Sequence, residues 1–267
     1  MKMKNSIKSR RDDTLLTVAL QPTAIIKIEN LQRTFEVGDE TVHALKGISF
    51  EVNKGEFISI MGTSGSGKST LLNILGCLDR PTVGEYRIDD ISVKDLSEDE
   101  LSTIRNRKIG FVFQNYSLLP RTSALEQVEL PLLYNNTVSD KQRRERAEQA
   151  LEQVGLKDRM KHTPNQMSGG QQQRTAIARA LAGDPVMLLA DEATGNLDTR
   201  TSYEIMCLFQ ELHDKGKSIV FVTHEPDIAM FTERTILLND GNIVKDGKVE
   251  TQSARQMLEA IMKQRSA

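Results

Sequence analysis

The sequence predicts an α/β protein with a mainly parallel central sheet, and its apolar patterning carries this prediction. Four short, almost wholly apolar runs have the length and composition of buried strands: 57–61, 109–113, 186–190 and 219–222. After the first run, Leu71, Leu75 and Leu78 repeat at helical spacing. Strands that alternate with helices favour a parallel sheet covered on both faces.

The remaining elements follow from weaker patterns. Shorter β-branched and aromatic runs at 25–28 and 48–52 predict strands, and a final strand pair at 235–238 and 242–245 flanks the turn Asp240-Gly241. The polar stretch 115–175 reads as a helical insertion. Within it, Ser139 and Gln142 fit a capping box, and an apolar stripe ends at Gly155. Met257, Leu258, Ile261 and Met262 predict one apolar face of a C-terminal helix that packs on the body.

The bulk composition indicates a globular protein and argues against nucleic acid as a partner. Of the 267 residues, 38% are apolar and 27% are charged, which is enough apolar surface for a packed core. The formal net charge is only −2, so no basic field favours nucleic acid. Cys77 and Cys207 have no ligand partners at metal-site spacing, and we expect both to be reduced thiols.

The first residues are basic, but they do not form an export signal or a membrane span. Arg10-Arg11 resembles a twin-arginine signal, but Asp12-Asp13 interrupts it and the apolar run from 15 to 20 is short. No stretch of the chain approaches the ~18 apolar residues that a spanning helix needs. We therefore expect residues 1–23 to be a loose basic leader on a soluble, cytoplasmic protein.

The most informative motif predicts a phosphate-binding loop. Residues 62–69 fit the pattern G-x-x-x-x-G-K-[ST], between a predicted strand and a predicted helix. Glycines let successive N–H groups face phosphate oxygens, Lys68 reaches the outer phosphates, and the Ser69 hydroxyl suits Mg²⁺. A plain Gly/Ser loop is the alternative, but the strand and helix around it favour the P-loop. The predicted nucleotide-binding residues are Gly62, Thr63, Ser64, Gly65, Ser66, Gly67, Lys68, Ser69 and Thr70.

Two carboxylates follow the apolar run at 186–190. At the carboxyl end of a parallel strand such side chains face the ligand crevice. Asp191 is therefore a candidate to hold Mg²⁺, directly or through its water, and Glu192 is a candidate to orient and deprotonate the attacking water. An acidic surface turn would be the commoner interpretation without the P-loop upstream. With the P-loop present, the pair predicts hydrolysis of a nucleoside triphosphate.

Residues 167–171, Met-Ser-Gly-Gly-Gln, resemble the LSGGQ motif of ABC ATPases, with Met167 in place of the usual leucine. The resemblance implies ATP as the nucleotide. It also implies a head-to-tail dimer, because in this family the motif closes over the ATP of the other subunit. The residues that would act in trans are Ser168, Gly169, Gly170, Gln171 and Asp198. The fold implied is an ABC cassette with an N-terminal antiparallel β subdomain and a helical subdomain.

Other family landmarks occur in the expected order. Gln114 resembles the Q-loop glutamine that senses Mg²⁺ and the attacking water, and residues 196–198 resemble the D-loop. His224 resembles the switch histidine that contacts the γ-phosphate. Phe35 occupies the position of the aromatic residue that stacks on adenine. The resemblance therefore implies catalytic roles for Lys68, Gln114, Glu192 and His224, and Mg²⁺ contacts from Ser69, Gln114 and Asp191.

The segments 111–114, 118–120 and 128–132 narrow the resemblance to the MacB/LolD group, whose members act with a membrane permease. We expect a nucleotide-binding domain over 24–250, with its helical subdomain at about 115–175, and a C-terminal helix or tail over 251–267. Residues 115–134 would form the groove that receives the permease. The subunit would then lie on the inner face of the cell membrane.

Two features depart from the family pattern. Ala193 and Thr63 replace common prolines, and neither change removes a reacting group. Two alternative functions stay open at this point. One is a regulator of cell-wall hydrolases that resembles the cell-division ATPase FtsE and also acts through a membrane partner. The other is a soluble ABC ATPase that acts on DNA or ribosomes, although such proteins usually carry two cassettes or long insertions, neither of which is present.

Overall fold

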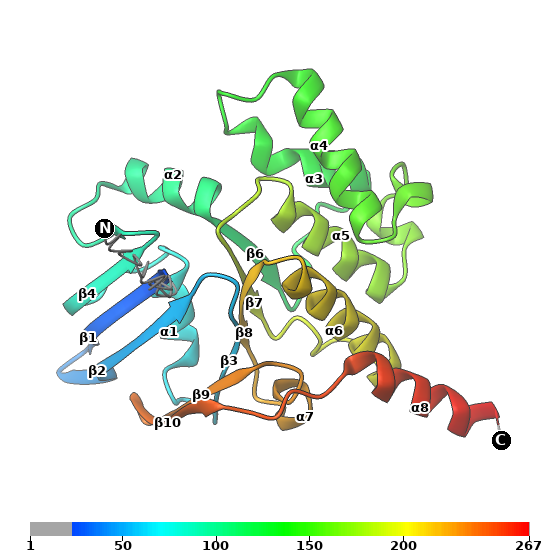
Figure 1. Cartoon of the computed structure of the whole chain (residues 1–267). Coiled ribbons are helices and arrows are strands. Elements are labelled where there is room, and N and C mark those ends of the chain that lie inside the picture. Colours follow the sequence, from blue (N-terminus) through cyan, green and yellow to red (C-terminus); the bar gives the residue numbers. More distant parts are fainter. Residues whose placement is uncertain (1–22, 267) are drawn as a thin grey trace, which may run out of the picture.

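Six strands form the main sheet among residues 23–266, the part of the chain that the computed structural model describes (Figure 1). In spatial order they are β10 (Asn242–Lys248), β9 (Arg234–Asn239), β3 (Phe57–Gly62), β8 (Ser218–Val222), β7 (Met187–Asp191) and β6 (Ile109–Phe113). β10 pairs antiparallel with β9, and the other strands run parallel. The predicted parallel sheet is confirmed, and the four apolar runs are β3, β6, β7 and β8.

The side chains of the main sheet alternate between two hydrophobic cores. Phe57 and Ile219 belong to one core, whereas Ile58 and Val220 belong to the other. Because both faces of the sheet are covered, its strands are apolar at nearly every position instead of alternating apolar and polar. The four apolar runs of the sequence show this pattern.

A second, antiparallel sheet covers one face. Its spatial order is β2 (Glu40–Asn53), β1 (Ala24–Val37), β4 (Val83–Ile88) and β5 (Ile91–Ser92). Residues of this sheet, of α1 (Lys68–Leu75) and of α2 (Glu98–Lys108) share the core that contains Ile58. The runs predicted at 25–28 and 48–52 are the paired ends of β1 and β2, so the expected antiparallel N-terminal sheet is confirmed.

Helices contribute most of the second core. α3 (Ala124–Leu133), α4 (Asp140–Gln153) and α5 (Gly169–Leu181) form a group beside the sheet, and α6 (Thr199–Asp214) lies between this group and α8 (Figure 1). The shorter elements are α7 (Pro226–Ala229) and two 3₁₀ turns, Lys157–Arg159 and Pro164–Gln166. The helix-rich stretch predicted at 115–175 corresponds to the α3–α5 group, although α5 continues to Leu181.

Four helices begin in the same way. The N-cap serines of α2, α3, α4 and α5 each accept a hydrogen bond from the N–H three residues on, and the Glu or Gln side chain at that position accepts one from the N-cap N–H. The N-cap residues are Ser97, Ser123, Ser139 and Ser168. The capping box predicted at Ser139 and Gln142 is thus confirmed, and α4 is followed by Gly155 with a φ of 76°.

The C-terminal helix α8 (Ala254–Ser266) packs on α6, with Met257, Leu258 and Ile261 against the core. Met262, expected on the same face, is instead 47% exposed, because the end of α8 lies at the outer edge of the molecule (Figure 1). Within residues 23–266 no helix is long and apolar enough to cross a bilayer. The predicted leader lies outside the described residues except for Thr23.

Candidate nucleotide site

The Gly-rich loop 62–67 joins the carboxyl end of β3 to the first turn of α1, as predicted. Gly67, the N-cap of α1, has a φ of 102°, and a Cβ at this position would lie 2.6 Å from the carbonyl oxygen of Ala44. Only glycine satisfies both constraints. The first N–H groups of a helix have no partner within it, so the start of α1 presents donors and a positive dipole end to an anion.

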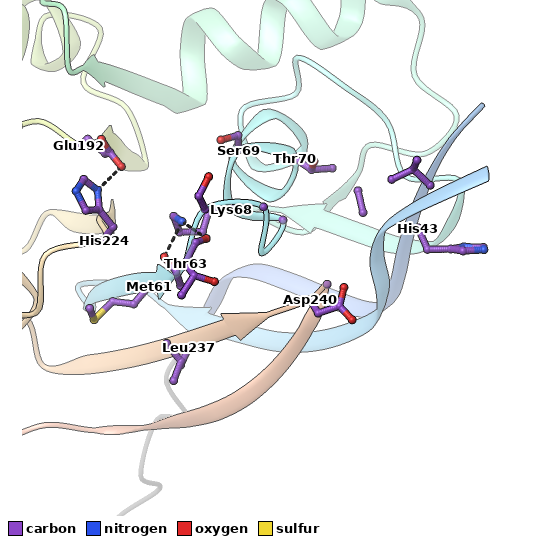
Figure 2. Close-up of a pocket in the computed structure, with 17 residues that line it drawn as sticks. His43, Met61, Thr63, Lys68, Ser69, Thr70, Glu192, His224, Leu237 and Asp240 are labelled. Atoms are coloured by element: carbon purple, nitrogen blue, oxygen red, sulfur yellow. Dashed lines mark hydrogen bonds and ion pairs between the residues drawn. The ribbon is translucent and has the colours of Figure 1, made fainter. Parts of the chain in front are cut away.

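A cavity of about 940 Å³ opens over this loop (Figure 2). Lys68, Ser69, Glu192 and His224 come to it from three separate parts of the chain. The residues that line the cavity are Val42, His43, Ala44, Met61, Gly62, Thr63, Ser64, Gly65, Gly67, Lys68, Ser69, Thr70, Glu192, His224, Leu237, Asp240 and Gly241. Of the predicted loop residues only Ser66 does not line it, and Ser66 is buried.

The Lys68 side chain lies over its own loop. Its Nζ donates to the carbonyl oxygens of Gly62 at 2.7 Å and Thr63 at 2.8 Å, as Figure 2 shows. These bonds hold the ammonium against the loop at the wall of the cavity. A cation held there is suited to bind the outer phosphates of a nucleotide.

The predicted acid pair follows β7 at the carboxyl edge of the sheet. Glu192 Oε1 lies 2.7 Å from His224 Nδ1 in a hydrogen bond that Figure 2 shows. Glu192 has a φ of 44°, and its N–H donates to Val222 O at 2.9 Å on β8. This turn directs the carboxylate into the cavity, where it is able to accept a proton from water, while the imidazole fixes its orientation.

Asp191 is beside the cavity but does not line it. Burial raises the pKa of its carboxyl group, the neighbouring Glu192 raises it further, and the Lys68 ammonium partly offsets both. Among residues 23–266 Asp191 forms no ion pair with a basic side chain. An ionised, partly buried carboxylate without such a partner is a suitable ligand for a hard cation.

Gln114 immediately follows β6, whose last residue, Phe113, pairs with Asp191. It does not line the cavity either. Its amide lies against Gly195, where an added Cβ would be 2.7 Å from Gln114 Nε2. Gln114 is therefore held at the same sheet edge as the acid pair, near the segment that leads to α6.

The predicted adenine-stacking residue, Phe35, also lies outside the cavity lining. It pairs across the β1–β2 hairpin with Val42, which does line the cavity, so the two side chains share one face of the sheet. The Arg33 guanidinium carbon lies 4.4 Å from the centre of the Phe35 ring, a cation–π contact.

The residues predicted to act in trans do not line the cavity of their own chain. Ser168 is the N-cap of α5, and its Oγ accepts a hydrogen bond from Gln171 N at 3.3 Å. Asp198 caps α6 by accepting hydrogen bonds from the backbone N–H groups of Arg200 and Thr201. A hydrogen bond from the Thr201 hydroxyl is the main cause that lowers the pKa of the Asp198 carboxyl group, and the two backbone bonds lower it further. Both segments therefore present helix N-termini outside the cavity.

Two parts of the cavity wall were not predicted. Val42, His43 and Ala44 come from β2, and the turn Asp240-Gly241 comes from β9 and β10. The turn was recognised only as a hairpin, and nothing in the local sequence of β2 signals a ligand. β2 and this turn reach the cavity because they pack closely on the P-loop. Lys46 N donates to Gly241 O, and Gly241 N donates to Ser66 O.

A phosphate-binding loop after a parallel strand, with an acid pair ending another strand of the same sheet, defines a P-loop NTPase. Comparison with known proteins makes the class specific. The sequence profile of the ABC transporter family matches residues 45–195. The chain belongs to this family, and it is an ABC ATPase of the MacB/LolD group.

Several relatives agree with this assignment. The uncharacterised ABC transporter ATP-binding protein YknY of Bacillus subtilis is 52% identical over 220 residues, which is 82% of this chain and 95% of YknY. The macrolide export ATP-binding/permease protein MacB of Syntrophobacter fumaroxidans is 51% identical, over 82% of this chain but only 31% of MacB. This chain therefore spans about a third of that MacB protein.

A solved structure of a relative shows the same fold. The ATP-binding cassette MJ0796 of Methanocaldococcus jannaschii, solved as a dimer in a post-hydrolysis state bound to ADP and Pi, superimposes with a TM-score of 0.76. It is 50% identical and covers 84% of this chain and 98% of MJ0796. The present chain is accordingly an ATP-binding, ATP-hydrolysing subunit of an ABC transporter.

Proposed function

We propose that two copies of this chain bind two ATP molecules head to tail and drive a separate permease of the MacB/LolD kind. The observation that carries the proposal is the position of Ser168–Gln171. This segment forms the start of α5, a position suited to bind phosphate, yet it does not line the cavity of its own chain. A partner's ATP would complete it, and the dimeric MJ0796 cassette supports such an arrangement.

In the proposed reaction Glu192 accepts the proton of the attacking water. His224, hydrogen-bonded to Glu192, keeps that carboxylate in position and reaches the γ-phosphate. Lys68 and the loop N–H groups stabilise the charge on the transferred phosphoryl group. Phe35 provides the stacking surface for adenine beside Val42.

The donor set of this site fits Mg²⁺. The Ser69 hydroxyl, the Asp191 carboxylate and the Gln114 amide oxygen are hard ligands, and we propose that they hold the ion, partly through water. Bound Mg²⁺ would neutralise charge on the phosphate oxygens. The raised pKa of Asp191, which has no basic partner among the described residues, supports its assignment as a ligand.

A separate groove supports the proposal of a permease partner. It measures about 620 Å³, and its walls include Leu78, Phe111 and Tyr134, with Leu78 53% and Tyr134 80% exposed. Exposed apolar side chains around a groove are typical of a site that a partner covers. Ser117, Pro131 and Tyr134 of this groove belong to the segment 115–134 expected to receive the permease. Docking there would hold the chain at the inner face of the membrane.

Glu192→Gln tests the assigned base. The amide cannot accept a proton, so we expect turnover to fall by at least about a hundredfold while ATP still binds. Because bound ATP would persist, the variant should form a stable dimer at saturating ATP. Phosphate release, equilibrium ATP binding and size-exclusion chromatography measure the three quantities.

Glu148→Gln is the matched control, since Glu148 is a surface residue of α4 paired with Arg144. It should hydrolyse ATP at the normal rate and form no trapped dimer. Normal turnover by Glu192→Gln would show that another group is the base. A variant that is inactive but stays monomeric at saturating ATP would contradict the head-to-tail dimer.

A further inference from the structure

The turn after β6 has an unusual backbone. Tyr116 and Ser117 have φ values of 56° and 50°, two successive residues in the left-handed region that non-glycine residues rarely adopt. Such a conformation persists where surrounding contacts impose it. The turn runs from Gln114 to Ser117 and therefore includes the glutamine assigned to the nucleotide site.

One side chain of α5 makes the main contact with this turn. Arg179 donates from one guanidinium nitrogen to Tyr116 O at 2.8 Å and from another to Ser117 O at 2.6 Å. The planar fork of an arginine is able to bind two neighbouring carbonyls at once, which the single ammonium of a lysine does not reproduce. Burial lowers the pKa of Arg179, and among residues 23–266 no carboxylate pairs with it. The partly buried guanidinium therefore depends on these two carbonyls for its hydrogen bonds.

The other side of the turn touches both segments that would act in trans. A Cβ added to Gly169 would lie 3.0 Å from the Tyr116 hydroxyl and 3.3 Å from Leu197 Cδ2, so Gly169 lies against both side chains. Asn196 Nδ2 donates to Gln114 O at 3.1 Å and to Asn115 Oδ1 at 2.8 Å. The shape of the turn thus determines what Gly169 and the 196–198 segment pack against.

We propose that Arg179 is a positioning residue for the site in trans: by clamping the carbonyls of Tyr116 and Ser117 it fixes Tyr116 against Gly169. Arg179 touches no nucleotide in this scheme and acts through Tyr116. The inference rests on the proposed head-to-tail dimer. It predicts that loss of the clamp weakens closure over the partner's ATP and leaves the P-loop of the same chain unaffected.

The test uses Arg179→Lys and Tyr116→Ala, each in the Glu192→Gln background. The first removes the two-carbonyl fork but keeps the charge, and the second removes the ring that contacts Gly169. We expect each to raise the ATP concentration for half-maximal dimer formation by about tenfold, because Arg179→Lys loses hydrogen bonds from a charged group and Tyr116→Ala loses the contact through which Arg179 acts. ATP binding, measured at protein concentrations too low for dimers, should stay unchanged. The double variant should add little to either single one.

Two further variants make the outcome decisive. Arg80→Lys is the matched control, because Arg80 also donates to two carbonyls, those of Lys94 and Leu96, but away from the turn. It should leave dimer formation unchanged. Ser168→Arg, which places bulk in the proposed trans site, should abolish dimers. Suppose that Ser168→Arg abolishes dimers while Arg179→Lys and Tyr116→Ala each change the ATP concentration for half-maximal dimer formation by less than twofold. The inference about Arg179 is then overturned, and the proposed function stands. If Ser168→Arg forms normal dimers, the proposed function fails and the inference falls with it.

Discussion

Asp191 carries an electrostatic cost in the folded chain. Burial and the neighbouring Glu192 raise the pKa of its carboxyl group, so it binds a proton more tightly in the folded than in the unfolded state. For an acid shifted in this direction, ionisation at neutral pH destabilises the fold. Stability is therefore gained as the pH falls through the raised pKa. A cation that binds the carboxylate removes this cost.

Asp191→Asn should therefore stabilise the chain in the absence of nucleotide and metal while abolishing ATP turnover. We expect the melting temperature at neutral pH to rise by about 2 °C, a difference that narrows as the pH falls through the raised pKa of Asp191. Thermal unfolding across a pH series measures it. Asp184→Asn is the control, since Asp184 is an exposed partner of Lys217 and its loss should bring no gain. A lower melting temperature for Asp191→Asn at neutral pH would contradict the argument.

At the same scale, the residues that the sequence revealed are those in contiguous motifs. Lys68, Ser69 and Glu192 could be predicted because loop, strand end and chemistry lie together in the chain, and the structure brings them to one cavity. His43 and Asp240 could not, because each reaches the cavity only through packing of a distant hairpin on the P-loop. The roles assigned to Phe35 and Gln114 stay predictions, as both lie beside the cavity.

At the scale of elements, α2 and α5 both start with a capping box, but in different surroundings. Ser97 and Ser168 each accept a hydrogen bond at 3.3 Å from the residue three positions on, Glu100 or Gln171. Each serine is therefore a helix cap, whatever else it does. Only the cap of α5 is assigned to a nucleotide, so the two helices allow stability to be separated from function.

Ser97→Ala and Ser168→Ala should each destabilise the chain by about 1 kcal/mol, since each removes one N-cap acceptor. Only Ser168→Ala should also slow ATP turnover, by about tenfold, because its hydroxyl would contact the partner's charged phosphates. Chemical denaturation and steady-state hydrolysis measure the two effects. Equal turnover in both variants would limit Ser168 to capping.

Most elements with a strong apolar pattern were predicted, although the amphipathic helix α6 was not, and several elements without such a pattern were missed. The four buried strands and the apolar stripe of α4 could be predicted because their buried residues form apolar patterns in the sequence. α2 was not predicted, because Leu101 and Ile104 are its only buried residues and a stripe of two does not stand out. β4 and β5 were also missed, because short strands with exposed positions such as Val83 and Ile91 resemble loops. The position of β4 is set by pairing with β1, and that of β5 by pairing with β4.

At the scale of the whole molecule, the two helix starts proposed to bind phosphate do not share a cavity. Lys68 opens α1 on the main sheet, whereas Ser168 opens α5 in the α3–α5 group (Figure 1). A two-fold dimer brings the same pair of surfaces together twice, so it creates two equal composite sites. Each site then contains α1 of one copy and α5 of the other.

Mixing two defective variants tests this arrangement. Lys68→Ala damages the P-loop and Ser168→Ala removes the trans hydroxyl, so neither variant alone forms an intact composite site. In an equal mixture with random pairing, half of the dimers contain one copy of each, and in these one of the two sites combines an intact P-loop with an intact Ser168. The mixture should therefore recover about a quarter of the wild-type ATPase rate if the sites turn over independently. Two copies of the same variant mixed at the same total concentration give the baseline. A mixture that stays at this baseline would mean that Lys68 and Ser168 of different copies do not share a site.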